Sequence, residues 1–417
     1  MKVLLVHPGK QHSFETAKAL KDAGVFYKYI TTVYDRPSSL TNKFKRFLVG
    51  KNLKKANTRR CAYLSDEDII QIYEWWGLLV LFLSKFPCLS KVYFHLNLSL
   101  SNHFADKAAK IAVRENVDAI IVYDGISRKG LEYVKKKAPQ IITIMDVSIS
   151  MRPFMQSVFE KDMKTYHHNG FYLEEKYLTN KHCMDVIRNE LKYVDYFFAP
   201  SVIVVQSLIY CSVSKEKIFK VPYGVNITQF KYKRKEVVTA SPLRLIFVGQ
   251  LSYRKGVHHL LNVVSRFTPD EVQLFLAGAY EPKKNLVNRF LNKLNIHFLG
   301  FITRDMLTQK LQAADVFVLP SLGEGMAMVI LEAMGTGTPV LISDMTGGND
   351  IIENGMNGIV CKAGSETSLF NAIEWYMNNR DKIPNMSLKA HDTALGYTWE
   401  HYHKSYGEQI LNILSSK

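Results

Sequence analysis

Two glutamates lie on either side of a predicted helix start. Glu324 and Glu332 are separated by seven residues in the segment SLGEGMAMVILE (321–332), which follows an apolar run at 316–319 and is expected to become helical at about Ala327. At about 1.5 Å of rise per helical residue, the carboxylates would lie on the order of 10 Å apart. Carboxylates accept hydrogen bonds from vicinal hydroxyls, and a helix N-terminus suits a diphosphate. This spacing suits a sugar nucleotide; the alternative is a capped helix with two surface glutamates.

A basic turn precedes another predicted helix. The segment FVGQLSYRKG (247–256) ends an apolar run at Val248, and Arg254 and Lys255 come just before a helix expected near Gly256. Cations at the carboxyl end of a parallel strand, beside a helix start, are well placed to hold phosphate. The alternative is a solvated basic turn.

The elements that must position these residues alternate between short apolar runs and helical patterns. Strands are predicted at 3–6, 27–32, 119–123, 141–145 and 218–222, and again at 244–248, 272–277, 296–299, 316–319 and 339–342. Strands that alternate with helices indicate parallel sheets with right-handed crossovers. The polar, basic stretch 229–242 is predicted to be a linker. We therefore expect an α/β fold with two domains in series, joined near 223–242.

Five segments in this order resemble the retaining glycosyltransferases of family 4. They are VPYGVN (221–226), the stretch 243–256, FLGFI (298–302), the pair of glutamates at 324–332 and GGNDIIENG (347–355). The glycine loop HPGKQH (7–12) matches loosely. The resemblance implies a GT-B fold, in which two Rossmann-like domains with parallel sheets face each other across a cleft. It implies an acceptor-side domain at 1–225, to which the C-terminal helix 399–417 returns, and a nucleotide-sugar domain at 226–398.

The resemblance also implies roles for individual residues. Glu324 would contact the donor sugar and Glu332 the ribose, while the phosphate-binding Arg/Lys pair of the family falls on Gln250 and Lys255. Because Gln250 replaces the arginine, Arg254 is expected to supply the lost charge. The catalytic residues are then Lys255, Arg254 and Glu324, and the remaining donor contacts fall on Gly9, Gly249, Phe301, Ile302, Gly325, Met326, Ala327 and Met328.

The family histidine near the transferred sugar has no counterpart in this chain. The corresponding segment, MDVSISMR (145–152), contains none. Asp146, Ser148 or Ser150 could replace it, and the alternative is a structural loop. The mechanism implied by the resemblance retains the anomeric configuration and uses neither a metal ion nor a cofactor.

A basic segment at 43–60 interrupts the α/β pattern. It carries eight lysines and arginines, no acidic residue, and interleaved apolar residues such as Phe44 and Phe47. Such a segment can lie on an anionic bilayer surface; the alternative is a solvated helix followed by a buried one at 75–84. No apolar run approaches the length of about 20 residues that a spanning helix needs. The five cysteines form no CxxC, so a cytoplasmic protein is expected, at most peripheral on the inner face of the membrane.

Two other patterns are given structural interpretations. Asp66, Glu67 and Asp68 fit a metal-binding DxD string, but acidic residues are favoured in the first turn of a helix, and an apolar run with Ile69 and Ile70 follows. The pairs His167–His168 and His258–His259 and the nearby His401 and His403 lack the carboxylate spacing of a metal centre. We therefore expect no metal site.

The net charge of +16 points to an anionic partner. We expect a nucleoside diphosphate sugar as donor, and a lipid-linked or polysaccharide acceptor in cell-surface glycan biosynthesis, such as lipopolysaccharide or capsule. Two alternatives stay open: another GT-B enzyme (an epimerase or phosphorylase) and a basic nucleic-acid-binding protein. Because no RNP, KH or zinc-finger signature occurs, we expect no nucleic-acid partner.

Overall fold

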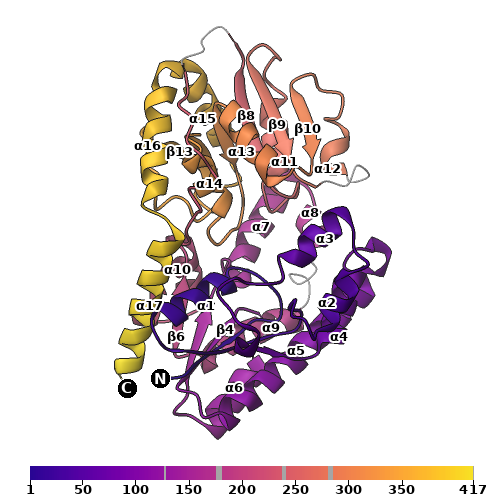
Figure 1. The fold of residues 1–417 in the computed structure, drawn as a ribbon. Helices are drawn as coiled ribbons and strands as arrows, with labels where there is room; N and C mark the ends of the chain where they lie inside the picture. Colours follow the sequence, from indigo (N-terminus) through magenta and orange to yellow (C-terminus); the bar gives the residue numbers. More distant parts are fainter. Residues whose placement is uncertain (126–127, 175–180, 237–240, 280–284, 417) are drawn as a thin grey trace.

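Two parallel sheets form the centre of the protein (Figure 1). The computed structural model describes residues 1–125, 128–174, 181–236, 241–279 and 285–416. The first sheet has the order β3-β2-β1-β4-β5-β6-β7 and the second the order β10-β9-β8-β11-β12-β13. The predicted α/β class with two parallel sheets is confirmed.

The strands of the first sheet are β1 (Val3–Val6), β2 (Phe26–Thr31), β3 (Ile69–Gln71), β4 (Ala119–Tyr123), β5 (Ile142–Asp146), β6 (Tyr196–Ala199) and β7 (Ile218–Lys220). Those of the second are β8 (Leu243–Val248), β9 (Val272–Ala277), β10 (Ile296–Gly300), β11 (Val316–Leu319), β12 (Val340–Ser343) and β13 (Gly358–Cys361).

The helices before the second sheet are α1 (Ser13–Asp22), α2 (Leu40–Lys45), α3 (Gly50–Asn57), α4 (Glu74–Leu83), α5 (Ser90–Arg114), α6 (Arg128–Lys137), α7 (Arg152–Tyr166), α8 (Gly170–Glu174), α9 (Lys181–Glu190) and α10 (Val202–Tyr210). Those that follow are α11 (Val257–Val264), α12 (Asn285–Asn288), α13 (Arg304–Ala313), α14 (Met328–Gly335), α15 (Glu366–Asn378), α16 (Ile383–Leu395) and α17 (Trp399–Ser415). Among the described residues, no helix combines the length and the apolar character that crossing a bilayer requires.

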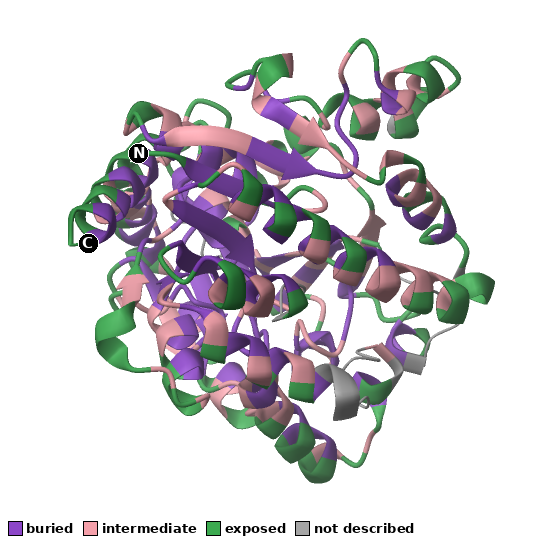
Figure 2. Ribbon diagram, turned by 90° about the horizontal axis from the view of Figure 1, so that it is seen from below, coloured by how far each residue is buried: buried purple, intermediate pink, exposed green. Residues whose placement is uncertain are grey.

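The central strands are buried along their whole length. Every residue of β1, β4, β5, β11 and β12 is buried. Strands that are covered by helices on both faces have continuous apolar sequences instead of alternating ones. Figure 2 shows this arrangement, with buried strands inside and exposed residues on the outer helices.

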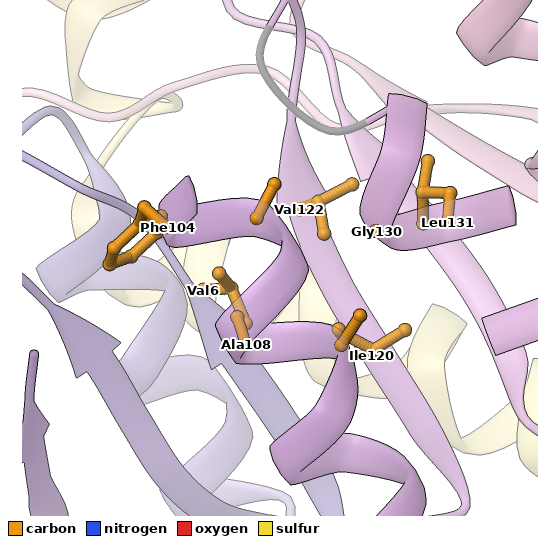
Figure 3. Close-up of a pocket in the computed structure, with 9 residues that line it drawn as sticks. Val6, Phe104, Ala108, Ile120, Val122, Gly130 and Leu131 are labelled. Atoms are coloured by element: carbon orange, nitrogen blue, oxygen red, sulfur yellow. The ribbon is translucent and has the colours of Figure 1, made fainter. Parts of the chain in front are cut away.

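Packing between the strands and their covering helices is tight. The apolar pocket among β1, β4, α5 and α6 has a volume of only about 10 Å³ (Figure 3). Phe104, Leu131 and Val122 are among the residues that line it. A space of that size holds at most one water molecule, so this pocket is a packing gap and not a ligand site.

The strand order reverses once in each sheet. In the first sheet the reversal lies between β1 and β4, and in the second between β8 and β11. Ligands of open parallel sheets bind outside the carboxyl ends of the strands at such a switch point. The loops that meet there are 7–12 with 124–125 in the first sheet, and 249–256 with 320–327 in the second. The predicted basic turn and Glu324 therefore lie in the two loops that flank the second switch point.

The last helix returns to the first sheet. Helix α17 packs against α1, and the hydroxyl groups of Tyr402 and Thr16 are 3.0 Å apart. The chain also crosses in the other direction, because α7 follows β5 of the first sheet and bonds to the second half, where the hydroxyl of Tyr166 donates to the carbonyl of Gly364 (3.0 Å). The domain limits given above, 1–225 with 399–417 and 226–398, stay a prediction.

One prediction about local structure is wrong, and another gains a structural detail. The triplet Asp66–Asp68 does not begin a helix; it forms a single 3-10 turn, and Ile69 begins the edge strand β3, which pairs with β2. The predicted linker 229–242, of which 237–240 lie outside the described residues, contains no helix or strand in its described part, but it is anchored to the second half of the chain. Lys235 is buried there, and its ammonium group donates to the carbonyls of Leu311, Gln312 and Ala314 at the end of α13. Burial lowers the pKa of Lys235 to about 7.

Candidate functional site

A buried carboxylate and two cations form the centre of the site. Oε1 of Glu324 accepts from Nζ of Lys255 at 2.7 Å and from the guanidinium of Arg254 at 2.8 Å. Arg254 also donates to the carbonyl of Gly323 (3.0 Å). The structure thus brings together the three residues that were predicted to be catalytic, from the loops after β8 and β11.

The electrostatic balance at Glu324 favours its charged form. Burial alone would raise the pKa of Glu324, but the positive charges of Lys255 and Arg254 outweigh burial and leave that pKa below its usual value. The carboxylate is ionised at neutral pH, and the two cations are held in fixed positions. Such a preorganised pair of cations can stabilise a phosphate that gains negative charge.

The loop after Glu324 touches the first half of the chain. Ile149 and Gly325 form an isolated antiparallel bridge, and the hydroxyl of Ser150 donates to the carbonyl of Glu324 (2.6 Å). A Cβ atom on Gly325 would lie 2.0 Å from the carbonyl oxygen of Ser148. Only glycine allows this approach, so the loops of the two switch points meet at residues 148–150 and 324–325.

The second glutamate lies apart from this cluster. Glu332 is the fifth residue of α14, which begins at Met328, so Glu324 precedes the helix and the two glutamates do not share it. The predicted separation of the two carboxylates assumed a helix over most of 324–332, but in the structure only residues from Met328 onward are helical. The guanidinium of Arg304 is 3.7 Å from the carboxylate of Glu332. Burial raises the pKa of Glu332, and the charge of Arg304 offsets part of that rise.

The other residues predicted to contact the donor lie in the loops after β8, β10 and β11, at the start of α14, and in the first sheet's loop 7–12. Gln250 and Phe301 are exposed, Ile302 is half-buried, and Gly249 adopts φ = 148°, which favours glycine. At the start of α14, Met326 and Ala327 are buried and Met328 is exposed. Gly9 lies elsewhere, at the first switch point, where its N–H donates to Nδ1 of His7 (2.9 Å).

The three candidates for the missing histidine lie in different surroundings. Asp146 is buried, and its Oδ1 accepts from Nε2 of His12 (3.0 Å). Ser150 is fully buried and bonds to the loop of Glu324, as described above. Ser148 is half-buried, and its hydroxyl donates to Asp124 (3.1 Å). Of the three, Ser148 is the one that lines the cavity at the first switch point.

Sequence analysis missed a cluster of buried histidines on one carboxylate. Asp162, on α7, accepts from Nε2 of His258 (3.0 Å), His259 (2.8 Å) and His168 (2.9 Å). Burial alone would raise the pKa of Asp162, but these hydrogen bonds hold it well below its usual range. No spacing signal was available, because Asp162 is 96 positions from His258 in the chain and only the fold brings them together.

The same groups are close enough together to be considered as ligands of a metal ion. The ligand atoms of Asp162, His258 and His259 all lie within 4.8 Å of one another, so they could hold an ion. However, Nδ1 of His168 accepts from the N–H of Gly170 (3.1 Å), which places the proton of His168 on Nε2, toward Asp162. His259 faces carboxylates on both sides, Asp162 and Glu366 (3.5 Å). The contacts of His168 and His259 are thus those of a hydrogen-bonded cluster, whereas Nδ1 of His258 is buried without a hydrogen-bond partner among the described residues.

Comparisons with known proteins give a consistent result. Residues 228–392 match the family described as glycosyl transferases group 1. An uncharacterized glycosyltransferase of Methanocaldococcus jannaschii is 28% identical over 192 residues, which cover 44% of this chain and 49% of that protein. An N,N'-diacetylbacillosaminyl-diphospho-undecaprenol alpha-1,3-N-acetylgalactosaminyltransferase of Campylobacter jejuni is 25% identical over 206 residues, or 46% of this chain and 54% of that protein. The chain spans about half the length of the curated relatives it matches.

Solved structures extend the likeness to the whole chain. The Anabaena protein HepE, in a crystal structure with UDP, matches with a TM-score of 0.62 and 16% identity, covering 100% of both chains. At that identity the match shows the fold alone. It confirms the predicted GT-B architecture, and the match over 228–392 confirms the resemblance to group 1 glycosyltransferases.

Within the histidine cluster, His258 predicts a loss of stability in acid. Burial lowers the pKa of His258 to about 4, against a usual value of 6.5. As the pH falls from 7 to 5, the unfolded chain takes up a proton that folded His258 does not, so folding weakens by about 2 kcal/mol from this group. In the variant His258→Gln, which keeps an N–H donor toward Asp162, the stability lost between pH 7 and pH 5 should be smaller by that amount.

Urea unfolding at both pH values measures this difference. The exposed His95→Gln is the matched control and should lose as much stability as the wild type. If His258→Gln had the same pH dependence as the wild type, His258 would not titrate as described.

Proposed function

We propose that this chain, whose residues 228–392 match the group 1 glycosyl transferases, transfers a sugar from a nucleoside diphosphate sugar to a lipid-linked or polysaccharide acceptor, with retention of configuration. The product would belong to cell-surface glycan biosynthesis. The proposal rests on one observation: the ionised carboxylate of Glu324 is ion-paired with Lys255 and Arg254 at the switch point of the second sheet.

The roles of these residues follow from their charges. When the donor binds, Lys255 and Arg254 would exchange the Glu324 carboxylate for the diphosphate, and Glu324 would then accept hydrogen bonds from sugar hydroxyls. Glu332, further along α14, would bind the ribose. The bond between the anomeric carbon and the phosphate oxygen breaks, the acceptor oxygen bonds to that carbon on the same face, and the acceptor proton passes to the departing phosphate. The loop at 148–150, which touches Glu324 and Gly325, would lie against the sugar.

Lys255 provides the first test. Replacing it with alanine removes one of the two cations expected to stabilise the leaving diphosphate, so kcat/KM should fall by roughly 10²–10³-fold, the range typical for loss of one such contact. The measurement is release of the nucleoside diphosphate from a donor sugar. Lys389→Ala, at an exposed position on α16, is the matched control and should retain full activity. Wild-type rates in a well-folded Lys255→Ala protein would refute the role.

Metal removal provides the second test. In this mechanism, side-chain cations and a helix N-terminus bind the diphosphate and stabilise its negative charge in place of a divalent ion. Activity should therefore be unchanged within twofold after dialysis against EDTA, and added Mg²⁺ or Mn²⁺ should not raise it. A loss of activity that a divalent ion restores would contradict the proposal, and Asp162→Asn would then show whether the histidine cluster holds that ion.

The acceptor is expected at a membrane because of one surface region. Helices α2, α3 and α4 pack together on one side of the molecule (Figure 1), and the rings of Phe44 and Trp75 are 6.4 Å apart. The side chains of Phe47, Trp75 and Phe82 are 83%, 61% and 56% exposed, so α4 is not the buried helix of the alternative given above. We call this region, α2–α4 with the lysines and arginines of 43–60, the basic lobe. Apolar residues among cations are typical of peripheral binding to anionic bilayers.

Liposome flotation tests this contact. The protein should float with vesicles that contain anionic phospholipid, and not with neutral ones. Lys54→Gln with Lys55→Gln should reduce the bound fraction several-fold, because each basic residue near an anionic surface contributes about 1 kcal/mol. The control is Lys389→Gln with Lys404→Gln on α16 and α17, which lie across the molecule from the lobe (Figure 1). Equal, negligible binding to both vesicle types would exclude the membrane contact.

A further inference from the structure

A second cavity lies at the switch point of the first sheet. Its volume is about 470 Å³, and loops that follow β1, β2, β4 and β5 contribute to its lining, together with residues of α4 and α5. By its position at the carboxyl edge of a parallel sheet, this is the place in the first half of the chain where a ligand is expected. It borders the donor loops, because Ile149 lines it and pairs with Gly325.

Cations dominate one part of this cavity. Lys10, Arg59 and Arg152 line it, against a single acidic residue, Asp124. In the part of the chain that the structure describes, neither Lys10 nor Arg59 is ion-paired with a carboxylate. Burial lowers the pKa of Lys10, and the neighbouring charge of Arg59 lowers it further. Two cations that line one cavity and repel each other, neither of them ion-paired among the described residues, form a site for an anion with more than one charge.

An apolar wall forms another part of the cavity. It consists of Val80 and Leu81 from α4 and of Leu98 and Leu100 from α5. Leu81 is also 37% exposed, and Phe82 beside it belongs to the exposed apolar surface of the basic lobe. The apolar wall is therefore continuous along α4 with the surface that is proposed to meet the bilayer. A ligand for this cavity must combine a multiply charged anion with an apolar chain.

We propose that the cavity binds the acceptor as a polyisoprenyl diphosphate. Lys10 and Arg59 bind the diphosphate, and Val80, Leu81, Leu98 and Leu100 contact the first isoprene units. The chain continues along α4 toward the bilayer. The sugar on the other side of the diphosphate then points toward the loop at 148–152 and the donor cluster. This inference rests on the proposed function and names the acceptor class and the residues that bind it.

Direct binding of a soluble analogue tests the proposal without measuring activity. Farnesyl diphosphate, inorganic pyrophosphate and farnesol are titrated into the full-length protein, with calorimetry and the fluorescence of Trp75 and Trp76 on α4 as readouts. Farnesyl diphosphate should bind at least tenfold more tightly than either of the other two, because only it fills both parts of the cavity. Equal affinity for farnesyl diphosphate and pyrophosphate would overturn the apolar half of the proposal, and equal affinity for farnesyl diphosphate and farnesol would overturn the anionic half.

Variants assign the binding to the named residues. Lys10→Gln with Arg59→Gln should weaken farnesyl diphosphate binding tenfold or more, and Leu81→Asn should weaken it severalfold. The exposed Lys54→Gln, on α3 outside the cavity, is the matched control and should bind as the wild type does. Unchanged binding in the double variant would overturn the assignment.

A thermal-shift screen with nucleoside diphosphate sugars, run on the same proteins, separates the two proposals. If a donor stabilises the protein but farnesyl diphosphate does not bind, this inference fails and the proposed function stands. If no nucleotide sugar stabilises the wild type, the proposed function itself fails.

Discussion

A buried carboxylate stays charged only if cations or hydrogen-bond donors contact it. Glu324 is nearly inaccessible to solvent, and its ionised form depends on Lys255 and Arg254 at 2.7 and 2.8 Å. Removing one partner of such a cluster leaves an uncompensated buried charge. The charged groups of a buried ion pair must therefore be held at close distances. The loops after β8 and β11 must therefore be placed together accurately, and the strand order of the second sheet does this by making those two strands neighbours.

The interface between the two halves follows from the same loops. Residues 148–150 bond to 324–325, and Asp162 on α7 binds histidines of α11, the helix that begins directly after the basic turn. The histidine cluster thus includes two residues of the helix that directly follows Arg254 and Lys255. Because His259 lies between Asp162 and Glu366, its pKa is raised despite burial. The contact between the halves thus includes a polar cluster on Asp162, which fixes the position of α11 and of the basic turn before it, and an apolar part in which Leu322 packs with Met155 and Phe159.

Much of the fold and of the donor cluster could be predicted from the sequence, for local reasons. Buried parallel strands are continuous apolar runs, so β1, β4, β8 and β11 were found within one or two residues. The cluster of Glu324, Lys255 and Arg254 followed from motifs that each occupy a single loop. The edge strand β3 was missed because three residues after an acidic turn are too few to show a period. The Asp162 cluster and the pair of Lys10 and Arg59 join segments that are distant in sequence, so only the topology reveals them.

The positions of the lysines and arginines in the fold also change the interpretation of the net charge of +16. A nucleic-acid-binding surface would present its cations as one continuous stripe. Here three groups of cations are found at different places: Lys255 and Arg254 against Glu324, Lys10 and Arg59 at the cavity of the first sheet, and the other lysines and arginines of 43–60 on the basic lobe. At physiological salt, exposed charges more than about 8 Å apart are largely screened from one another. Each group can therefore act on its own anion. Under the proposed function, the buried pair would bind a group small enough to enter a loop cluster, the cavity pair a head group with an apolar tail, and the lobe an extended surface.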